Sequence, residues 1–250
     1  MTQRWPDRLW IVRHGESAGN VARDAAQAAR LARIDIAQRD VDVPLSTLGA
    51  EQADALGRWF AGLQAAERPD VLLVSPYLRA RDTAARVYAQ GGTRVEPAGF
   101  GIDERLREKE FGVLDLLTRV GIETDFPDQA RFRALLGKFY HRPPGGESWC
   151  DVILRLRSVV DTLHLRHADR RVLIVAHQVV VLCLRYLLEG MDEAGILAVD
   201  QEGDVANCGV TEYGPDGAGG IKLLRYNVTV PMEREGATVT DAPDSPVVLR

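Results

Sequence analysis

Short apolar runs alternate along the chain with longer stretches in which apolar residues recur at helical spacing. Three of these runs are rich in valine, leucine and isoleucine and end in polar residues; they occupy positions 9–12, 71–74 and 172–175. Runs of this length beside turn residues are typical of buried strands, and the stretches between them are long enough for helices. The pattern therefore predicts an α/β fold: a three-layer α/β/α sandwich with a mostly parallel central sheet and helices on both faces.

Two later segments carry clear secondary-structure signals. From Ser148 to about His167, apolar residues recur at helical spacing and predict a helix whose apolar stripe packs on the sheet. Between about residues 205 and 226, two strand-like runs flank a Pro-Asp-Gly turn at 215–217, which is typical of a hairpin.

The length of 250 residues and the hydrophobic content of 46% suit one compact domain, expected over residues 1–230. Within it, residues 21–42 are rich in alanine and arginine, and predict a helical insertion near the mouth of the site. This insertion serves either substrate gating or only stability and subunit contact. Residues 231–250 contain Pro243 and Pro246 among many polar residues, and predict a C-terminal tail that is either loosely ordered or a flap.

Polar residues follow each of the three predicted strands. Arg13 and His14 follow the first, Arg79 lies shortly after the second, and His177 follows the third. Because the carboxyl ends of parallel strands meet at one edge of a sheet, these side chains are expected to converge in a cationic pocket. Arg81 is an alternative to Arg79, since both arginines fall in the same predicted helix.

A pocket with two arginines suits a phosphoryl group. Guanidinium groups match phosphate oxygens, and they repel a divalent metal at a site that they share with histidines, so no metal is expected. Asn20, Ser17 and the amide groups at the start of the following helix are expected to bind the same anion. His14 is then the expected nucleophile. His177 is expected to be positively charged and to stabilise the phosphoryl oxygens during transfer.

These motifs resemble the histidine phosphatase superfamily, also called phosphoglycerate mutase-like, and they occur in order over roughly residues 9–226. The resemblance rests on Arg-His-Gly-Glu-Ser at 13–17, Pro-Leu-Ser-Thr-Leu-Gly at 44–49, the arginine within 75–83, Pro-Gly-Gly-Glu-Ser at 144–148 and Ala-His at 176–177. It implies a phosphoglycerate mutase-like fold and one catalytic domain. It also implies covalent catalysis through a phosphohistidine at His14, without a cofactor.

The resemblance further implies a glutamate as proton donor, and the segment 104–112 points most directly to Glu108. Glu104 and Glu110 are the alternatives. A carboxylic acid there would protonate the departing alkoxide, and its carboxylate would then activate the attacking water. Because a nearby phosphate raises the pKa of a carboxyl group, we expect activity to be highest at mildly acidic to neutral pH.

The same pocket can transfer the phosphoryl group to water or back to a sugar acid. Residues 138–148 and Gln178 resemble the fructose-2,6-bisphosphatase branch more than the mutases, which implies a phosphatase. Lys138 and Arg142 are candidates for holding a second negative group of the substrate, although they also fit a solvated basic loop. The alternatives are a cofactor-dependent phosphoglycerate mutase and an inactive phospho-ligand binding module.

The net charge indicates which partners the chain can bind, and the cysteines and the lack of long apolar segments indicate its compartment. A net charge of -5 provides no general basic surface for nucleic acid or anionic lipid, so a small phosphorylated substrate is the expected partner. No segment has the length of a membrane span or the pattern of a signal peptide, which predicts a cytoplasmic protein. Cys150, Cys183 and Cys208 are isolated and indicate reduced thiols. The oligomeric state stays open, with a homodimer as one option.

Overall fold

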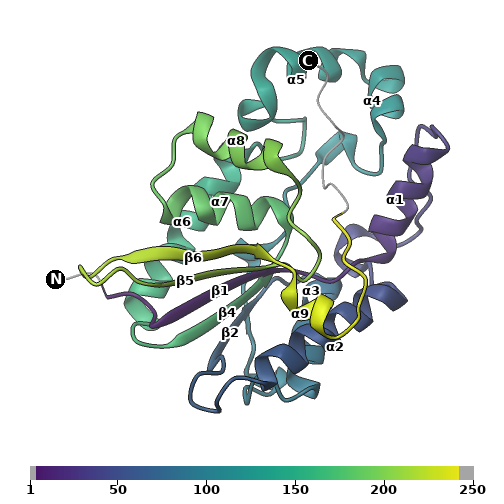
Figure 1. Cartoon of the computed structure of the whole chain (residues 1–250). Helices are drawn as coiled ribbons and strands as arrows, with labels where there is room; N and C mark the ends of the chain where they lie inside the picture. The colour runs from purple at the N-terminus through teal and green to yellow at the C-terminus, as the bar shows by residue number, and fades with distance from the viewer. Residues whose placement is uncertain (1–3, 242–250) are drawn as a thin grey trace.

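A six-stranded sheet forms the centre of the computed structural model, which describes residues 4–241 (Figure 1). The strands are β1 (Arg8–Arg13), β2 (Val71–Val74), β3 (Gly101–Ile102), β4 (Arg171–Ala176), β5 (Val210–Pro215) and β6 (Ile221–Val228). Their order across the sheet is β3-β2-β4-β1-β5-β6. β3, β2, β4 and β1 are parallel to one another, whereas β5 and β6 continue the sheet in antiparallel orientation. The predicted mostly parallel sheet is confirmed.

Helices cover both faces of this sheet (Figure 1). They are α1 (Ala18–Ala28), α2 (Thr47–Ala61), α3 (Leu78–Ala89), α4 (Arg119–Asp125), α5 (Pro127–Tyr140), α6 (Trp149–Arg166), α7 (Gln178–Leu188), α8 (Glu193–Glu202) and α9 (Val230–Arg234). α2, α3 and α9 pack on one face, and α6, α7 and α8 pack on the other. Among residues 4–241, no helix has both the length and the apolar composition needed to span a bilayer.

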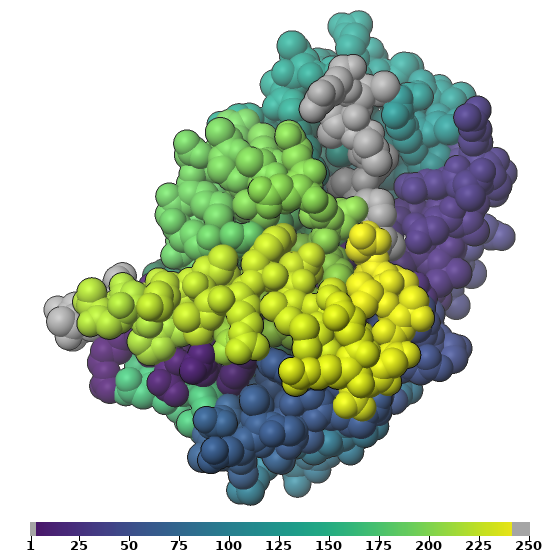
Figure 2. All heavy atoms as spheres, in the orientation of Figure 1, coloured from purple at the N-terminus to yellow at the C-terminus, as the bar shows by residue number. Residues whose placement is uncertain are grey.

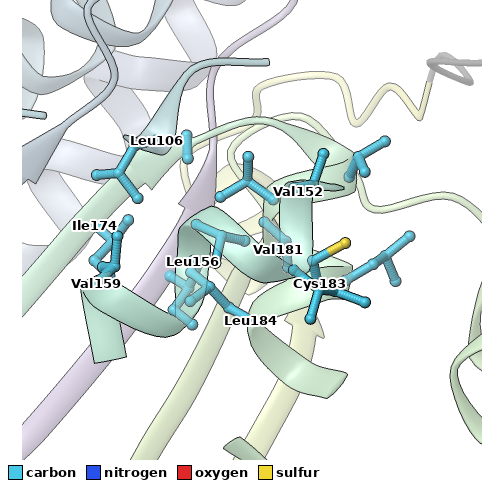
Figure 3. Close-up of a cluster of buried hydrophobic side chains, with 14 of the residues drawn as sticks. Leu106, Val152, Leu156, Val159, Ile174, Val181, Cys183 and Leu184 are labelled. Carbon is cyan, nitrogen blue, oxygen red and sulfur yellow. The ribbon is translucent and has the colours of Figure 1, made fainter. Parts of the chain in front are cut away.

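The alternation of side chains along the strands divides the core between the two faces. Leu9 and Ile11 of β1 belong to the cluster formed with α6 and α7, whereas Trp10 and Val12 belong to the cluster formed with α2 and α3. Figure 3 shows the first of these clusters, in which side chains of α6 and α7 lie close to Ile174 of β4. Burial on both faces explains why these strands are continuous apolar runs.

Helix α6 coincides with the helix predicted over residues 148–167. Ser148 caps its N-terminus, because its hydroxyl accepts a hydrogen bond from the Asp151 amide at 3.2 Å and its own amide donates to the Asp151 carboxylate at 2.8 Å. The fully buried residues of the predicted stripe are Val152, Leu156, Val159 and Leu163. β5 and β6 likewise form the hairpin that the Pro-Asp-Gly turn predicts.

The segment expected to form a helical insertion, residues 21–42, is α-helical only in its first part and ends in one 3-10 turn at Asp40–Asp42. α1 ends at Ala28, and residues 29–39 form no helix. Within them, the Ile34 amide donates to the Leu116 carbonyl at 2.9 Å, so this segment lies against the loop that precedes α4. In Figure 1, α1, α4 and α5 group together at one end of the molecule. A gating role for this segment stays a prediction.

The chain returns to the sheet after β6. Met232 in α9 is fully buried in the cluster formed with α2 and α3, and Figure 2 shows this yellow segment lying against the blue residues of α2. The Thr240 carbonyl accepts a hydrogen bond from the Asn207 amide at 2.8 Å, and the Thr240 hydroxyl accepts one from the Gln52 side chain at 2.9 Å. The side chain of Asn207 also donates to the His14 carbonyl at 3.0 Å. The first part of the expected tail is therefore packed, and Pro243 and Pro246 lie outside the described residues.

Candidate active site

The ends of the central strands bring the predicted histidines together. β1 and β4 pair with Arg13 opposite Ala176, so the residues that follow, His14 and His177, lie at the same edge of the sheet. Their ring centroids are 5.1 Å apart. Ser75 follows β2, and its hydroxyl oxygen lies 2.7 Å from Nε2 of His177. Parallel pairing of the three strands thus produces a polar site at their carboxyl ends.

His14 is held as a neutral imidazole. The ring is buried, and Nδ1 lies 2.7 Å from the carbonyl oxygen of Gly15, which can only accept, so we assign the ring proton to Nδ1. Nε2 accepts a hydrogen bond from Nε of Arg79 at 3.2 Å. Burial, followed by the charges of Arg79 and Arg13, lowers the pKa of His14 well below its ordinary value. The lone pair on Nε2 is therefore available as a nucleophile.

Two glycines let the turn after His14 pack against the start of α2. A Cβ atom on Gly15 would lie 2.4 Å from the carbonyl oxygen of Gly49, and a Cβ atom on Gly49 would lie 1.8 Å from that of Glu16. Neither position has room for a side chain. Ser46, the N-cap of α2, donates its hydroxyl hydrogen to the Glu16 carboxylate at 2.6 Å. The motif at 44–49 therefore fixes the turn that carries the nucleophile.

Arg79 lies in the first turn of α3 with its guanidinium group beside His14. Its side chain is 6% exposed, whereas Arg81 faces solvent, which separates the two candidates. Nη1 of Arg79 donates to the Asp40 backbone carbonyl at 2.6 Å and lies 2.9 Å from the Asp40 carboxylate. The sequence analysis did not identify Asp40, because only the folded chain brings it to α3. Its carboxylate occupies the guanidinium edge that an anionic ligand would also use.

Arg13 lies behind His14 with its side chain fully buried. Nη1 donates to the Val205 carbonyl at 2.6 Å and to Oε1 of Gln178 at 2.9 Å. Gln178 in turn donates from Nε2 to the Asp204 carboxylate. Gln178 therefore orients Arg13. Its side chain is taken up in this buried network, and the predicted contact of Gln178 with substrate stays a prediction.

Ser17 and Asn20 begin α1 and line the cavity beside His14. The Ser17 hydroxyl accepts a hydrogen bond from the Asn20 backbone amide at 3.1 Å, so Ser17 is the N-cap of α1. The Oδ1 atom of Asn20 accepts from the amide and the hydroxyl of Ser17, each at 3.0 Å. The donor Nδ2 of Asn20 is thus the group that can bind an anion in the cavity, since the backbone amides of Ala18 and Asn20 already donate to the Pro44 carbonyl at 3.0 Å and to the Ser17 hydroxyl at 3.1 Å.

Of the three candidate glutamates, Glu108 is the one that reaches the cavity. Its side chain is buried and lines the cavity, whereas Glu104 and Glu110 are exposed. Oε1 accepts the Lys109 amide hydrogen at 2.6 Å, and Oε2 lies 3.7 Å from Nδ1 of His177. This position suits a proton donor beside the nucleophile.

Two residues absent from the sequence-based site hold the segment that carries Glu108. The Glu147 carboxylate accepts hydrogen bonds from Arg107 at 2.7 Å, Arg155 at 3.0 Å and the Glu110 amide at 3.1 Å. Arg155 also donates to the Glu108 carbonyl at 3.2 Å. Burial alone would raise the pKa of Glu147, but the hydrogen bond from Arg155 and the other donors lower it. The motif at 144–148 was a signal for this role, because it contains Glu147.

Without a bound anion, the surroundings of His177 favour its neutral form, whereas the sequence predicts a positive charge during phosphoryl transfer. Burial, followed by the charges of Arg79 and His14, lowers the pKa of His177 well below its ordinary value. The sequence shows the neighbouring cations but not the complete burial, which is the larger cause. A phosphate dianion bound beside the ring would favour its charged form and raise the pKa again.

The structure does not bring Lys138 and Arg142 to the cavity beside His14, and their role in holding a second negative group stays a prediction. Lys138 forms an ion pair with Asp200, and its Nζ lies 5.1 Å from the ring centroid of Trp149. The side chain of Arg142 is 62% exposed and donates to the Asp151 carboxylate. Each cation is held by a carboxylate in its own neighbourhood, which spacing along the sequence does not reveal.

The cavity beside His14 has a volume of about 120 Å³ and is partly open to solvent. Its inner end is formed by His14, Ser17, Asn20, Arg79 and Glu108. Its outer part contains Arg23 of α1 and Arg133 of α5, two arginines that the sequence analysis missed. Arg23 follows Asn20 by three residues on the same helix, which was an available signal. Arg133 reaches the cavity only through tertiary folding.

Comparison with known proteins places the chain in a family. The model described as "Histidine phosphatase superfamily (branch 1)" matches residues 9–229. A phosphoglycerate mutase-like protein from Arabidopsis thaliana is 30% identical over 166 residues, covering 63% of this chain and 53% of that protein. A 6-phosphofructo-2-kinase/fructose-2,6-bisphosphatase from Caenorhabditis elegans is 31% identical over 180 residues, covering 72% of this chain and 33% of that protein. The chain thus spans about half or less of the length of these two relatives.

Solved structures extend the comparison to the fold. The structure of a mycobacterial glucosyl-3-phosphoglycerate phosphatase in complex with VO3 has a TM-score of 0.67 and 28% sequence identity. The match covers 89% of this chain and 99% of that one. The family match over residues 9–229 includes the motifs at the strand ends. The chain belongs to branch 1 of the histidine phosphatase superfamily.

Proposed function

We propose that this chain hydrolyses phosphomonoesters and that His14 carries the phosphoryl group between the two halves of the reaction. The observation that carries the proposal is the state of His14. Its Nδ1 donates a hydrogen bond to the Gly15 carbonyl, and its Nε2 accepts one from Arg79. Glu108 lines the same cavity. Membership of the superfamily and a phosphatase among the similar solved structures support it.

In the first half-reaction, the lone pair on Nε2 of His14 attacks the phosphorus atom of the ester. The bond from phosphorus to the ester oxygen breaks, and that oxygen takes a proton from the carboxylic acid of Glu108. The proton on Nδ1 stays in its hydrogen bond to the Gly15 carbonyl throughout. The products of this step are the free alcohol, a phosphohistidine and the Glu108 carboxylate.

In the second half-reaction, the Glu108 carboxylate takes a proton from a water molecule as the water oxygen attacks phosphorus. The bond from phosphorus to Nε2 of His14 breaks, and the electron pair returns to the ring. Inorganic phosphate leaves, and Glu108 is again protonated. One carboxyl group therefore serves as acid and then as base, which its single position beside the cavity permits.

Fixed cations stabilise the charge that spreads over the phosphoryl oxygens during both transfers. Arg79 contributes its guanidinium group, and the side-chain amide of Asn20 contributes a neutral donor. Arg13 is held behind His14 by Val205 and adds positive potential. These groups are in place before substrate binds, so little reorganisation accompanies the reaction.

Hydrolysis is favoured over mutase chemistry by the openness of the cavity. A mutase must keep the phosphohistidine from water while its substrate reorients, and this requires a closed site. The cavity here opens to solvent beyond His14, so water can reach phosphorus. An inactive binding module would not need a nucleophile and an acid in one cavity, as His14 and Glu108 are.

The test is transfer of radiolabelled phosphate from a monoester to His14. We expect an acid-labile, base-stable label on the protein and release of inorganic phosphate. His14→Ala should lose the label and reduce turnover by more than roughly a thousandfold, because the nucleophile is gone. His164→Ala is the matched control, since His164 packs on Trp5 in a different part of the chain.

The other outcomes are distinct. Unchanged turnover in His14→Ala would contradict the proposal. Isomerised phosphoglycerate without release of phosphate would indicate a mutase, and binding of monoesters without label or turnover would indicate a binding module.

A further inference from the structure

The proposed reaction uses the polar groups of the cavity beside His14 and leaves its apolar lining without a role. This lining, the apolar wall, contains both buried and partly buried side chains. The buried ones are Val43, Leu114, Leu117 and Ile122, and the partly buried ones are Ile34, Ile36, Phe111 and Leu116. Apolar side chains that stay open to a cavity, next to a few converging polar groups, are typical of a site that binds the body of a ligand.

Two segments far apart in the sequence form the apolar wall together. Ile34 follows α1 and Leu116 precedes α4, and Figure 1 shows these two helices at the same end of the molecule. The Ile34 amide donates to the Leu116 carbonyl at 2.9 Å, and Arg33 forms an antiparallel β-bridge with Leu117. The wall is therefore in place before a substrate binds, and binding does not have to order it.

Leu116 has an unusual backbone conformation within this wall. Its φ angle is 57°, in the left-handed region that few residues other than glycine adopt. Its amide donates to the Asp115 carboxylate at 3.0 Å, which fixes the turn. A glycine would take this conformation without strain, whereas the leucine side chain is kept although it strains the backbone. Such strain at the wall of a cavity is typical of a functional position.

The arginines that line the cavity beside this wall interact with carboxylates of the protein. The Nε atom of Arg23 lies 3.5 Å from the Asp24 carboxylate. Burial lowers the pKa of Arg133, and the charge of Asp200 acts in the opposite direction. The protein itself thus supplies countercharges in this region, and the apolar wall is the feature that can select the rest of a substrate.

We infer that the substrate is a phosphomonoester with an apolar leaving alcohol, one that carries an aromatic or branched hydrocarbon group, and that the apolar wall around Leu116 selects it. His14, Glu108 and the wall line one cavity, so an alcohol whose ester oxygen lies beside Glu108 can extend over the wall. Contact with the wall removes hydrocarbon from water, whereas a hydroxyl group there would lose water without gaining a partner. This inference rests on the proposed hydrolase function and names its substrate class.

The test compares two esters of nearly the same shape. 4-Ethylphenyl phosphate ends in a methyl group, and 4-(hydroxymethyl)phenyl phosphate has a hydroxyl group in its place. Their phenols have similar acidity, so the chemical step is equally demanding for both. We expect kcat/KM to be about tenfold or more higher for the ethyl ester, because an apolar surface binds a hydrocarbon group more tightly than a hydroxyl group. The difference should appear mainly in KM, since this group does not react.

Two phosphonates measure the same preference without turnover. 4-Ethylbenzylphosphonate and 4-(hydroxymethyl)benzylphosphonate have a carbon atom in place of the ester oxygen and cannot be hydrolysed. We expect the Kd of the ethyl compound, measured by calorimetry, to be about tenfold lower.

Variants then locate the preference. Leu116→Asn replaces the apolar side chain with a polar one that tolerates a positive φ, and should lower the ratio of the two kcat/KM values by about threefold to tenfold. Leu116→Met stays apolar and should keep most of the ratio. Val113→Asn is the matched control, because Val113 lies in the same loop, is 44% exposed and is outside the cavity lining. Melting curves identify any variant that does not fold.

The outcomes separate the two proposals. Equal kcat/KM values for the two esters overturn the inference and leave the hydrolase function standing. If neither ester is hydrolysed but the ethyl phosphonate binds more tightly, the hydrolase function is overturned and the apolar selection is supported. Equal Kd values for the phosphonates overturn the inference whether or not the esters react. A ratio that is unchanged in folded Leu116→Asn, or lost in Val113→Asn, overturns the assignment to Leu116.

Discussion

At the scale of single residues, the protonation state of the two buried imidazoles, His14 and His177, decides what chemistry the site can perform. Burial is the largest cause of the lowered pKa of both His14 and His177, and the neighbouring arginines act in the same direction. A neutral His14 keeps its lone pair under mildly acidic conditions, where most histidines in water have lost it to a proton. The nucleophile is therefore available in the same pH range in which Glu108 is needed in its acid form.

Asp40 offers a test of whether its carboxylate competes with a bound anion for the guanidinium group of Arg79. Replacing Asp40 with Asn removes the carboxylate 2.9 Å from Nη1 and leaves the backbone contact in place. Because an oxyanion then competes with no carboxylate, we expect the inhibition constant of inorganic phosphate to fall several-fold. Steady-state inhibition in the presence of a monoester substrate measures it.

The same turn supplies the control for this prediction. Asp42→Asn removes a carboxylate that pairs with Arg39 near the surface, and should leave the inhibition constant unchanged. An unchanged inhibition constant in Asp40→Asn would show that the carboxylate does not compete with anions, and a higher one would show that Asp40 assists their binding.

At the scale of elements, the site depends on one helix that contributes no side chain to the cavity lining among the described residues. Arg155 of α6 and Glu147 just before it hold the segment that carries Glu108. Glu147 is ionised and accepts hydrogen bonds from three donors, two of them guanidinium groups. Loops carry catalytic groups accurately only when a rigid element fixes them, and α6 is that element here.

Glu147→Gln tests whether the ion pairs of Glu147 hold the segment that carries Glu108. The amide keeps the shape of the side chain but loses the charge that holds Arg107 and Arg155, so Glu108 should shift relative to His14. We expect kcat to fall by roughly tenfold to a hundredfold, since small misplacements of reacting groups have effects of this size. Binding of inorganic phosphate should change little, because the inner end of the cavity is built by other elements.

The exposed Glu104 provides the matched control, and Glu104→Gln should have the kcat of the unchanged protein. A normal kcat in Glu147→Gln would show that the segment holds its position without the charge.

Sequence periodicity predicted the elements well, because burial on one or two faces leaves a regular pattern. The strands around His14 and His177 and the helix capped by Ser148 follow from such patterns. The positions of Lys138 and Arg142 do not, because the nearest carboxylate to each is set by folding. Asp40 was missed for the same reason. A residue's place in a motif predicts which strand end it follows, but not which charges surround it.

At the scale of the whole molecule, the two neutral histidines link stability to pH. In the unfolded chain each imidazole takes a proton below about pH 6.5, whereas the folded protein keeps both neutral. The unfolded state therefore binds more protons, so the contribution of these two histidines to the free energy of unfolding should be constant above about pH 7.5 and decrease as the pH falls through 6.5. The slope approaches about 1.4 kcal/mol per pH unit for each histidine.

Urea denaturation at a series of pH values between 5 and 8 measures this slope. The double variant His14→Asn with His177→Asn should have a shallower slope, and His164→Asn is the matched control. An unchanged slope in the double variant would show that other groups set the pH dependence. Glu147 and other carboxyl groups with a lowered pKa act in a separate window, because their contribution is lost only below about pH 4.5.

The hydrogen bonds of Thr240 have a practical consequence for anyone who shortens this chain. Thr240 meets Asn207 and Gln52, and the same two side chains donate to the His14 carbonyl and accept from the Glu16 amide at 2.9 Å. Truncating the chain before residue 240 would thus remove the hydrogen bonds that Thr240 makes to Asn207 and Gln52. Each of these residues is in turn hydrogen-bonded to the turn that carries His14. Expression boundaries chosen for this protein need to keep that threonine.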